Sequence, residues 1–421
     1  MHVTSGTPSG QFRAPRVPTL EPAVEQQIAQ AWGSLQDQAD AIADDITLTL
    51  LERDPYWSEQ GAERQADLRA STRQHIRRGI RAMAGIPDPD QPATDVWRET
   101  GRLRAQQGVP MDRVLNAYTQ GTRTLWEALL RQRWDNKLDI EERLLLLAGQ
   151  KLWAALDVQN AIFVDSYRRE TARLQRRNLQ LQQNFLDGLV EGRGADPEFA
   201  REAREELGLG PEEAVVCVVA PFDGPLDEPL RAPEDRLERM GVSSHWHVRG
   251  GNYFGLVRSG TLSVEQLVQV LQPCAAGRVG LAPCLEGLTG FATAYQLASR
   301  AAESLRRGTQ RLVSVADLIP EVLLAGSPEV IPVLVAETVG PLLHQPEQQA
   351  EMLLDTLAAL LAHDGSPTHA AEALFCHRNT VIYRMKQIES LTGRSLQSPR
   401  DKFELTLGLL ATGRSIDGRS A

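Results

Sequence analysis

The spacing of apolar residues divides the chain into a helical N-terminal part, a mixed middle part and a helical C-terminal part. From residue 20 to about residue 165, apolar positions recur three and four residues apart, as on one face of an amphipathic helix. Short breaks rich in Pro, Gly and Asp interrupt the pattern. We therefore predict an all-α bundle over 20–165, with helices near 21–53, 58–84, 94–107, 110–135 and 139–167.

A long polar segment, 166–194, follows the bundle and is predicted to be a linker helix. Tyr167, Leu174 and Leu181 recur every seven residues, as on the seam of a coiled coil. Asn178 lies on the same seam, where an amide can fix the register of a parallel dimer. Because the pattern covers fewer than four heptads, a single helix that caps the bundle explains it equally well. Both interpretations stay open.

Between residues 195 and 317, short apolar strands alternate with helical segments. The predicted strands are 214–222, 244–248, 252–257 and 277–283, and the predicted helices lie near 263–273 and 288–308. Arg249, Gly250 and Gly251 join the second and third strands as a hairpin turn. This order predicts a small α+β domain.

The C-terminal part is predicted as a linker over 318–345 and a helical domain over 346–414. Within it, Ser366 and Pro367 form a typical helix start, and a tight turn separates this short helix from a second one that begins at His377. On the second helix Val381 and Ile388 form a core-facing stripe. We expect a closing helix to present the core face Phe403, Leu407 and Leu410.

The other side of that second helix combines basic, amide and hydroxyl side chains. Arg can bind guanine and Asn can bind adenine in the major groove, while Lys and Tyr can reach phosphates. Between residues 378 and 394 the chain has four basic residues and one acidic residue. An ordinary charged surface helix is the alternative. The candidate DNA-binding residues are His377, Arg378, Asn379, Thr380, Tyr383, Arg384, Lys386 and Gln387.

The same segment, THAAEALFCHRNTVIYRMKQIESLTGRSL, resembles the C-terminal helix-turn-helix of PucR/CdaR-type bacterial transcriptional regulators. In that family a His-x-Asn-Thr-Val/Leu run opens the recognition helix, and His377, Asn379, Thr380 and Val381 match it here. Cys376 departs from the small or β-branched residue that the family often has in the turn. The resemblance implies a DNA-binding regulator and covers about the last 60 residues.

The N-terminal bundle resembles the N-terminal domain of RsbT co-antagonist proteins, on the runs LRASTRQHIRRGIRAM and RETGRLRAQQGVPMDRVLNAYTQGTRTLWEAL. That resemblance implies a globin-like, dimerising signal-input fold. His75 is the only histidine between residues 20 and 165. It would be a haem ligand in a haem-binding globin, but we predict a packed or solvated histidine.

The hairpin at Gly250, Gly251, Asn252, Tyr253 and Phe254 resembles a GGDEF motif without its acidic residues. A cyclase needs carboxylates there to hold divalent metal ions. We therefore predict a GGDEF-like domain that is catalytically dead, although two glycines also suit an ordinary hairpin turn. His245 and His247 share one strand face, yet no further metal ligand is evident beside them, so we predict no metal site.

Composition narrows these expectations. The chain has 421 residues, of which 42% are hydrophobic and 24% charged, as in globular proteins, and its net charge of -10 confines any DNA contact to a local surface. Four cysteines without a CxxC pair, and no apolar run of membrane-spanning length, predict a cytoplasmic protein. Residues 1–19 are predicted to be a disordered tail.

Together these patterns predict a multi-domain protein: an all-α bundle, an α+β GGDEF-like domain and an all-α helix-turn-helix domain. We expect a sequence-specific transcriptional regulator that binds double-stranded DNA as a homo-oligomer, with no catalytic residues and no cofactor; a small-molecule effector is left open. The alternatives are a stress-signalling scaffold that binds proteins through its bundle, and, less favoured, a cyclic-dinucleotide enzyme or sensor.

Overall fold

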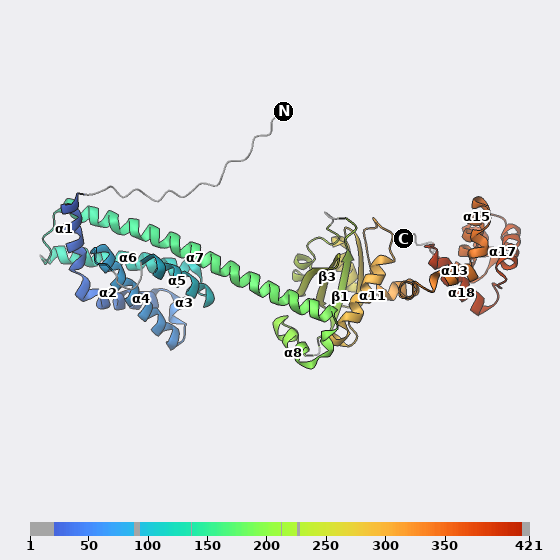
Figure 1. The fold of residues 1–421 in the computed structure, drawn as a ribbon, viewed down its shortest axis with the longest axis horizontal. Helices are drawn as coiled ribbons and strands as arrows, with labels where there is room; N and C mark the ends of the chain where they lie inside the picture. Colours follow the sequence, from blue (N-terminus) through green and yellow to red (C-terminus); the bar gives the residue numbers. More distant parts are fainter. Residues whose placement is uncertain (1–20, 88–92, 136, 212, 225–227, 415–421) are drawn as a thin grey trace, which may run out of the picture. The chain divides into compact units, whose positions relative to one another are not determined.

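The computed structural model describes residues 21–87, 93–135, 137–211, 213–224 and 228–414. The predicted tail, 1–19, lies outside these residues. Contacts divide the chain into two compact units, residues 1–178 and 179–421. No helix among the described residues is both long and apolar enough to cross a membrane. Figure 1 shows the helices and strands of each unit.

The first unit is a helical bundle, as predicted. Its helices are α1 (Pro22–Gly33), α2 (Ala39–Arg53), α3 (Pro55–Ser58), α4 (Ala62–Met83), α5 (Ala93–Gln106), α6 (Met111–Trp134) and the first part of α7 (Glu142–Val190). The predicted helix 21–53 is two helices, because the short 3₁₀ segment Gln36–Gln38 breaks it. The core includes Trp32, Ile46, Leu129 and Phe163, which have at most 1% of their surface exposed.

Helix α5 lies unusually close to α7, and Gly101 makes this contact fit. A Cβ atom at Gly101 would lie 2.9 Å from the carbonyl oxygen of Phe163 and 2.9 Å from Cβ of Ser166. The Ser166 hydroxyl donates a hydrogen bond of 2.7 Å to the carbonyl oxygen of Arg98. The absence of a side chain at Gly101 therefore lets the Ser166 side chain of α7 hydrogen-bond to the backbone of α5.

Helix α7 has 49 residues, ends at Val190, and joins two segments that we predicted separately, 139–167 and 166–194. Its first turns pack into the bundle, where the Trp126 ring lies against Gly149. From residue 175 to residue 181 every side chain is exposed within this chain. Of the predicted heptad seam, Asn178 and Leu181 are exposed, Leu174 is half-buried, and Tyr167 packs against the bundle core.

The middle region is an α+β domain around a five-stranded sheet of order β2-β3-β1-β4-β5. The strands are β1 (Val215–Pro221), β2 (Ser244–Arg249), β3 (Asn252–Arg258), β4 (Arg278–Pro283) and β5 (Arg311–Ser314). The helices are α8 (Pro197–Glu206), α9 (Pro233–Glu238), α10 (Val264–Leu271) and α11 (Phe291–Glu303). The sheet is antiparallel except for the pair β4–β5, and β5 is a strand that the sequence pattern did not reveal.

Strand β1 lies at the centre of the sheet and is buried along its whole length. Successive side chains of a strand point to opposite faces. Cys217 and Val219 accordingly pack with α8 and α11, and Val216 and Val218 pack with α9 and α10. Gly280 on β4 lets α11 approach, because a Cβ atom there would collide with the carbonyl oxygen of Ala298.

The C-terminal region is helical. Its helices are α12 (Ile319–Ala325), α13 (Ile331–Glu337), α14 (Gly340–Leu343), α15 (Glu347–Ala362), α16 (Pro367–Ala373), α17 (Arg378–Thr392) and α18 (Pro399–Ala411). Their shared core contains fully buried leucines of α15 and α18 together with Ala370, Val381 and Ile388. Leu342 of α14 is also fully buried in it, so the segment 318–345 contributes to this core.

Candidate nucleic-acid interface and middle-domain hairpin

Helices α16 and α17 form a helix-turn-helix whose ends are capped by side chains. The Ser366 hydroxyl accepts a hydrogen bond from the backbone N–H of His369, at 3.5 Å. Nδ1 of His377 accepts one from the backbone N–H of Asn379, at 3.2 Å. Because Nδ1 accepts, the neutral imidazole carries its proton on Nε2. His377, which is exposed, therefore starts α17 and presents a donor to solvent.

The inner face of α17 fixes its position. Val381 and Ile388 are fully buried and pack with Leu357 of α15 and with Ala370 and Ala371 of α16. The small alanine side chains of α16 let the two helices pack closely. The opposite face of α17 is consequently held at the surface.

Five of the eight candidate DNA-binding residues are exposed, either at the start of α17 or along its outer face. They are His377, Arg378, Asn379, Tyr383 and Lys386. Tyr383 is 70% exposed, which is unusual for a large aromatic side chain.

The other three candidates, Thr380, Arg384 and Gln387, are only half-exposed. Nη1 of Arg384 donates to Oγ1 of Thr356, at 3.4 Å, so this arginine connects α17 to α15. The structure thus brings all eight residues onto one helix, with three of them nearer to the core than the sequence pattern indicated.

The charges of this region are distributed unevenly. Residues 346–414 contain seven lysines and arginines and eight acidic residues, so the domain as a whole is not basic. Four of the seven cations form ion pairs, namely Arg394, Arg400, Lys402 and Arg414. Arg378 and Lys386 form no ion pair within the described part of the chain. The uncompensated positive charge therefore lies on α17, near its N-terminal half.

The β2–β3 hairpin carries the predicted degenerate motif. Gly250 and Gly251 form its turn with φ angles of 55° and 82°, a left-handed conformation that favours glycine. The amide of Asn252 donates to the hydroxyl of Tyr295, at 3.0 Å. Phe254 is fully buried. The turn thus has the geometry of a two-residue hairpin, and Asn252 is bound within the domain.

The tyrosine of the motif is also engaged. The Tyr253 hydroxyl donates to Oε1 of Glu234, at 2.7 Å, and its ring stacks on Trp246 at a centroid distance of 5.2 Å. Burial, and then the Glu234 carboxylate, raise the pKa of Tyr253. At neutral pH this side chain is a neutral hydrogen-bond donor, which makes it a poor substitute for a metal-binding carboxylate.

The two histidines of β2 have partners of their own. Nε2 of His245 donates to the carbonyl oxygen of Leu207, at 2.9 Å, and Nε2 of His247 lies 3.3 Å from Oδ2 of Asp187. Arg249 also binds Asp187, at 2.9 Å. Among the described residues, no group of three or more His, Cys, Asp or Glu side chains is arranged to hold a metal ion.

Three family models match the chain. Residues 40–182 match the RsbT co-antagonist protein rsbRD N-terminal domain, residues 191–304 match the GGDEF-like domain, and residues 353–411 match the PucR C-terminal helix-turn-helix domain. Residues 353–411 are therefore a PucR-type helix-turn-helix domain. All three resemblances proposed from the sequence are thereby confirmed.

Other proteins match parts of the chain. An uncharacterised protein of Mycobacterium tuberculosis is 32% identical over 241 residues, 54% of this chain and 56% of that protein. The Purine catabolism regulatory protein of Bacillus subtilis is 39% identical over 67 residues, 16% of this chain and 13% of that protein. The Carbohydrate diacid regulator of Escherichia coli is 41% identical over 58 residues, 14% of this chain and 15% of that protein. The match to the mycobacterial relative spans about half of that protein's length.

Two exposed aromatic residues of the PucR-type domain were missed or misplaced by the sequence pattern. Phe403 is 63% exposed, and the buried side of α18 is Leu405, Gly408 and Leu409, so the predicted core face was wrong. Thr338 packs against Gly408 and leaves no room for a Cβ atom there. Phe375 in the turn is 97% exposed. The spacing of apolar residues misplaced Phe403, because it cannot tell which side of a short helix meets its neighbours. It says nothing of Phe375, which lies in a turn.

Proposed function

We propose that the chain is a transcriptional regulator that binds double-stranded DNA sequence-specifically through α17 and acts as a dimer or higher oligomer. The observation that supports this most directly is the exposed, unpaired charge of Arg378 and Lys386 beside Asn379, on a helix whose other face is locked into a core. The regulator names of the Bacillus subtilis and Escherichia coli relatives support the same proposal.

The N-terminal half of α17 is proposed to lie in the major groove. Arg378 and Asn379 then reach base edges, and Lys386, two turns further on, reaches a phosphate. His377 and Tyr383, both exposed, flank these contacts. One such helix covers only about four to five base pairs, so useful affinity requires two copies on neighbouring half-sites.

Alanine substitutions in α17 test the assignment. We expect Arg378→Ala and Asn379→Ala each to reduce discrimination between a selected genomic fragment and scrambled DNA by about 1–3 kcal/mol, because each removes a base contact. Mobility shift or fluorescence anisotropy on the full chain measures both affinities. Wild-type discrimination in both variants would contradict the proposed base contacts.

Lys386→Ala separates a phosphate contact from a base contact. We expect it to weaken binding to all DNA sequences alike and to reduce the slope of log affinity against log salt by about 1. Arg201→Ala is the matched control, because it removes one exposed positive charge from α8 of the middle domain. If Arg201→Ala and Lys386→Ala behave alike, net charge and not a local contact governs binding.

The GGDEF-like domain is proposed to be a structural or regulatory module and not a cyclase. Asn252 and Tyr253 replace the two carboxylates, and both are bound by neighbours in the domain. Incubation of the purified chain with GTP and Mg²⁺ should give no cyclic dinucleotide. Formation of that product would restore the enzyme alternative.

A further inference from the structure

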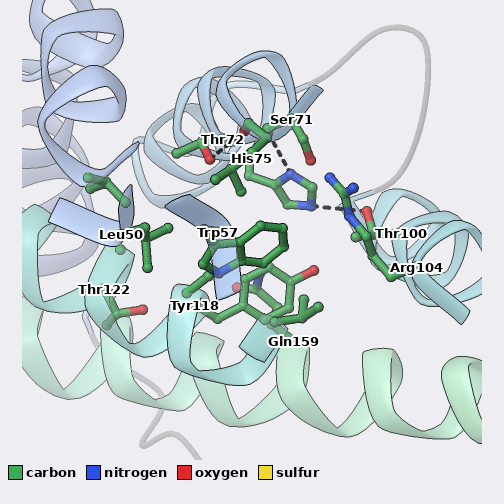
Figure 2. Close-up of a pocket in the computed structure, with 15 residues that line it drawn as sticks. Leu50, Trp57, Ser71, Thr72, His75, Thr100, Arg104, Tyr118, Thr122 and Gln159 are labelled. Carbon is green, nitrogen blue, oxygen red and sulfur yellow. Dashed lines mark hydrogen bonds between the residues drawn. The ribbon is translucent and has the colours of Figure 1, made fainter. Parts of the chain in front are cut away.

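A cavity of about 70 Å³ lies inside the N-terminal bundle, lined by residues from α2 to α7. Figure 2 shows its labelled side chains, with His75, Thr100 and Arg104 on one side and Leu50 and Thr122 on the other. Aliphatic residues such as Ile46, Leu50, Leu68 and Val114 make the lining largely apolar. The cavity is therefore an apolar space with a concentrated polar edge.

His75 contributes a hydrogen-bond acceptor to that edge. Its Nδ1 lies 2.8 Å from the carbonyl oxygen of Ser71, and since a carbonyl only accepts, Nδ1 carries the proton. Burial lowers the pKa of His75, and the nearby Arg104 charge lowers it further. The ring is consequently neutral at pH 7, with a lone pair on Nε2 that requires a donor.

The Thr100 hydroxyl cannot donate to both hydrogen-bond acceptors at this edge. Its hydroxyl oxygen lies 3.1 Å from Nε2 of His75 and 2.9 Å from the carbonyl oxygen of Val96. A hydroxyl has a single proton, so it can donate to only one of these acceptors at a time. The other acceptor can be served by a donor that enters the cavity.

Tyr118 contributes a donor with no acceptor. By distance and angle its buried hydroxyl has no hydrogen-bond partner, but Gln159 and Thr100 lie close enough to lower the pKa of Tyr118 against the effect of burial; we follow the distance and angle, because a hydrogen bond requires both. The ring is fixed by an edge contact with Phe163 at 5.4 Å and lies 5.7 Å from His75. Burial raises the pKa of Tyr118 to about 12, so the hydroxyl keeps its proton. Buried polar groups in native proteins normally have partners, which points to a missing one here.

We propose that this cavity binds a small neutral molecule with a hydroxyl head and an apolar body of about two to four carbon atoms. Its hydroxyl accepts from Tyr118 and donates to Nε2 of His75, and its body covers the aliphatic wall. A cavity of about 150 Å³ holds benzene. The present cavity has about half that volume, so it holds a molecule of about half the size. A carboxylate fits poorly, because it has no proton for Nε2 and because Arg104 is already paired with Asp67, at 2.6 Å.

An effector role for this molecule rests on the proposed function, but its binding does not. Gln159 places α7 in the cavity lining, and α7 extends from the bundle to Val190. Binding is therefore measured directly on the full chain, without DNA. Failure of DNA binding and failure of the cavity proposal then give different results.

Propan-2-ol and acetone form a matched pair of probes, because they share a carbon skeleton and acetone lacks the hydroxyl proton. Saturation-transfer difference NMR titrations of the full chain measure both. We expect propan-2-ol to bind with a Kd on the order of 0.1–1 mM and acetone at least about tenfold more weakly. Equal binding of the two, or binding of neither because the cavity holds only water, would overturn the proposal.

Tyr118→Phe tests the site itself. It removes the unpartnered hydroxyl and keeps the ring, so we expect the fold to be retained and propan-2-ol binding to fall about five- to tenfold. Tyr167→Phe is the control, because the Tyr167 hydroxyl donates to Val109 at 2.9 Å and does not line the cavity. That variant should bind propan-2-ol as the wild type does. An unchanged affinity in Tyr118→Phe would place the ligand elsewhere.

Discussion

Phe375 adopts a left-handed backbone conformation that phenylalanine disfavours. It has φ = 50° in the turn between α16 and α17, and its ring is 97% exposed. The left-handed conformation costs a residue with a Cβ atom about 1–2 kcal/mol. The next residue, Cys376, donates its N–H to the carbonyl oxygen of Ala371, which closes the turn. The turn geometry thus imposes the conformation, and an almost fully exposed ring gains little packing in return.

Glycine at this position should relieve the strain. We expect the free energy of unfolding to be about 1 kcal/mol higher for Phe375→Gly than for Phe375→Ala. Both variants lose the ring, and only glycine tolerates the positive φ. Urea denaturation followed by circular dichroism measures the difference. Equal stability of the two variants would show that the turn relaxes around alanine.

At the scale of elements, the contact between α5 and α7 depends on Gly101. A methyl group there would lie within 3.1 Å of three atoms of α7, two of them in its backbone. We expect Gly101→Ala to lower the free energy of unfolding by about 1–3 kcal/mol, because backbone cannot move aside as a flexible side chain can.

Gly79→Ala is the control for this prediction. Gly79 also lies inside a helix, α4, but a Cβ atom there would meet nothing within 4 Å. We expect this variant to be about 0.5–1 kcal/mol more stable than the wild type, because alanine favours a helix. Tryptophan fluorescence reports on the bundle within the full chain, since six of the seven tryptophans lie there. Equal effects of the two substitutions would mean that α5 does not approach α7 closely.

The same pair of helices predicts a pH dependence. Glu170 of α7 accepts hydrogen bonds from Arg173 and from Gln106 of α5, and these bonds lower its pKa to about 2 from an ordinary value of 4.5. A lowered folded-state pKa stabilises the fold above the unfolded pKa and loses that contribution as the pH falls toward 2. Between pH 6 and pH 3, the free energy of unfolding should therefore fall less for Glu170→Gln than for the wild type. Urea denaturation at the two pH values measures this, and an equal fall in both proteins would contradict the prediction.

At the scale of the whole molecule, we propose that the dimer contact lies on the exposed part of α7. Leu174 and Leu181 lie on the seven-residue seam with Asn178, and residues 175 to 181 have no cover within this chain. We expect Leu174→Lys combined with Leu181→Lys to convert a dimer to a monomer, because both charges would face each other across the seam.

Leu179→Lys is the matched control, since Leu179 is 52% exposed and lies off the seam. It should leave the dimer intact. Analytical ultracentrifugation of the full chain gives the molecular mass in each case. A monomeric wild type, or a dimer that survives the double substitution, would leave α7 as a single helix and move the dimer contact elsewhere.

The sequence by itself determined the fold class and all three domain types. Helical and strand periods are local, and Ser366, Pro367 and the glycines of the hairpin specify helix starts and turns within a few residues. The run around His377 and Asn379 also located the second helix of the helix-turn-helix domain, α17. The sequence pattern did not predict strand β5, because four residues are too few to show a period.

Only the tertiary structure decided which side chains are free to act. In the folded chain Arg384 hydrogen-bonds to Thr356, and four cations of the C-terminal region form ion pairs with carboxylates. Arg378 and Lys386 remain exposed. The tertiary structure also brought His75, Thr100 and Tyr118 from three helices to one cavity. These outcomes depend on contacts between residues far apart in the chain, and no local period encodes such contacts.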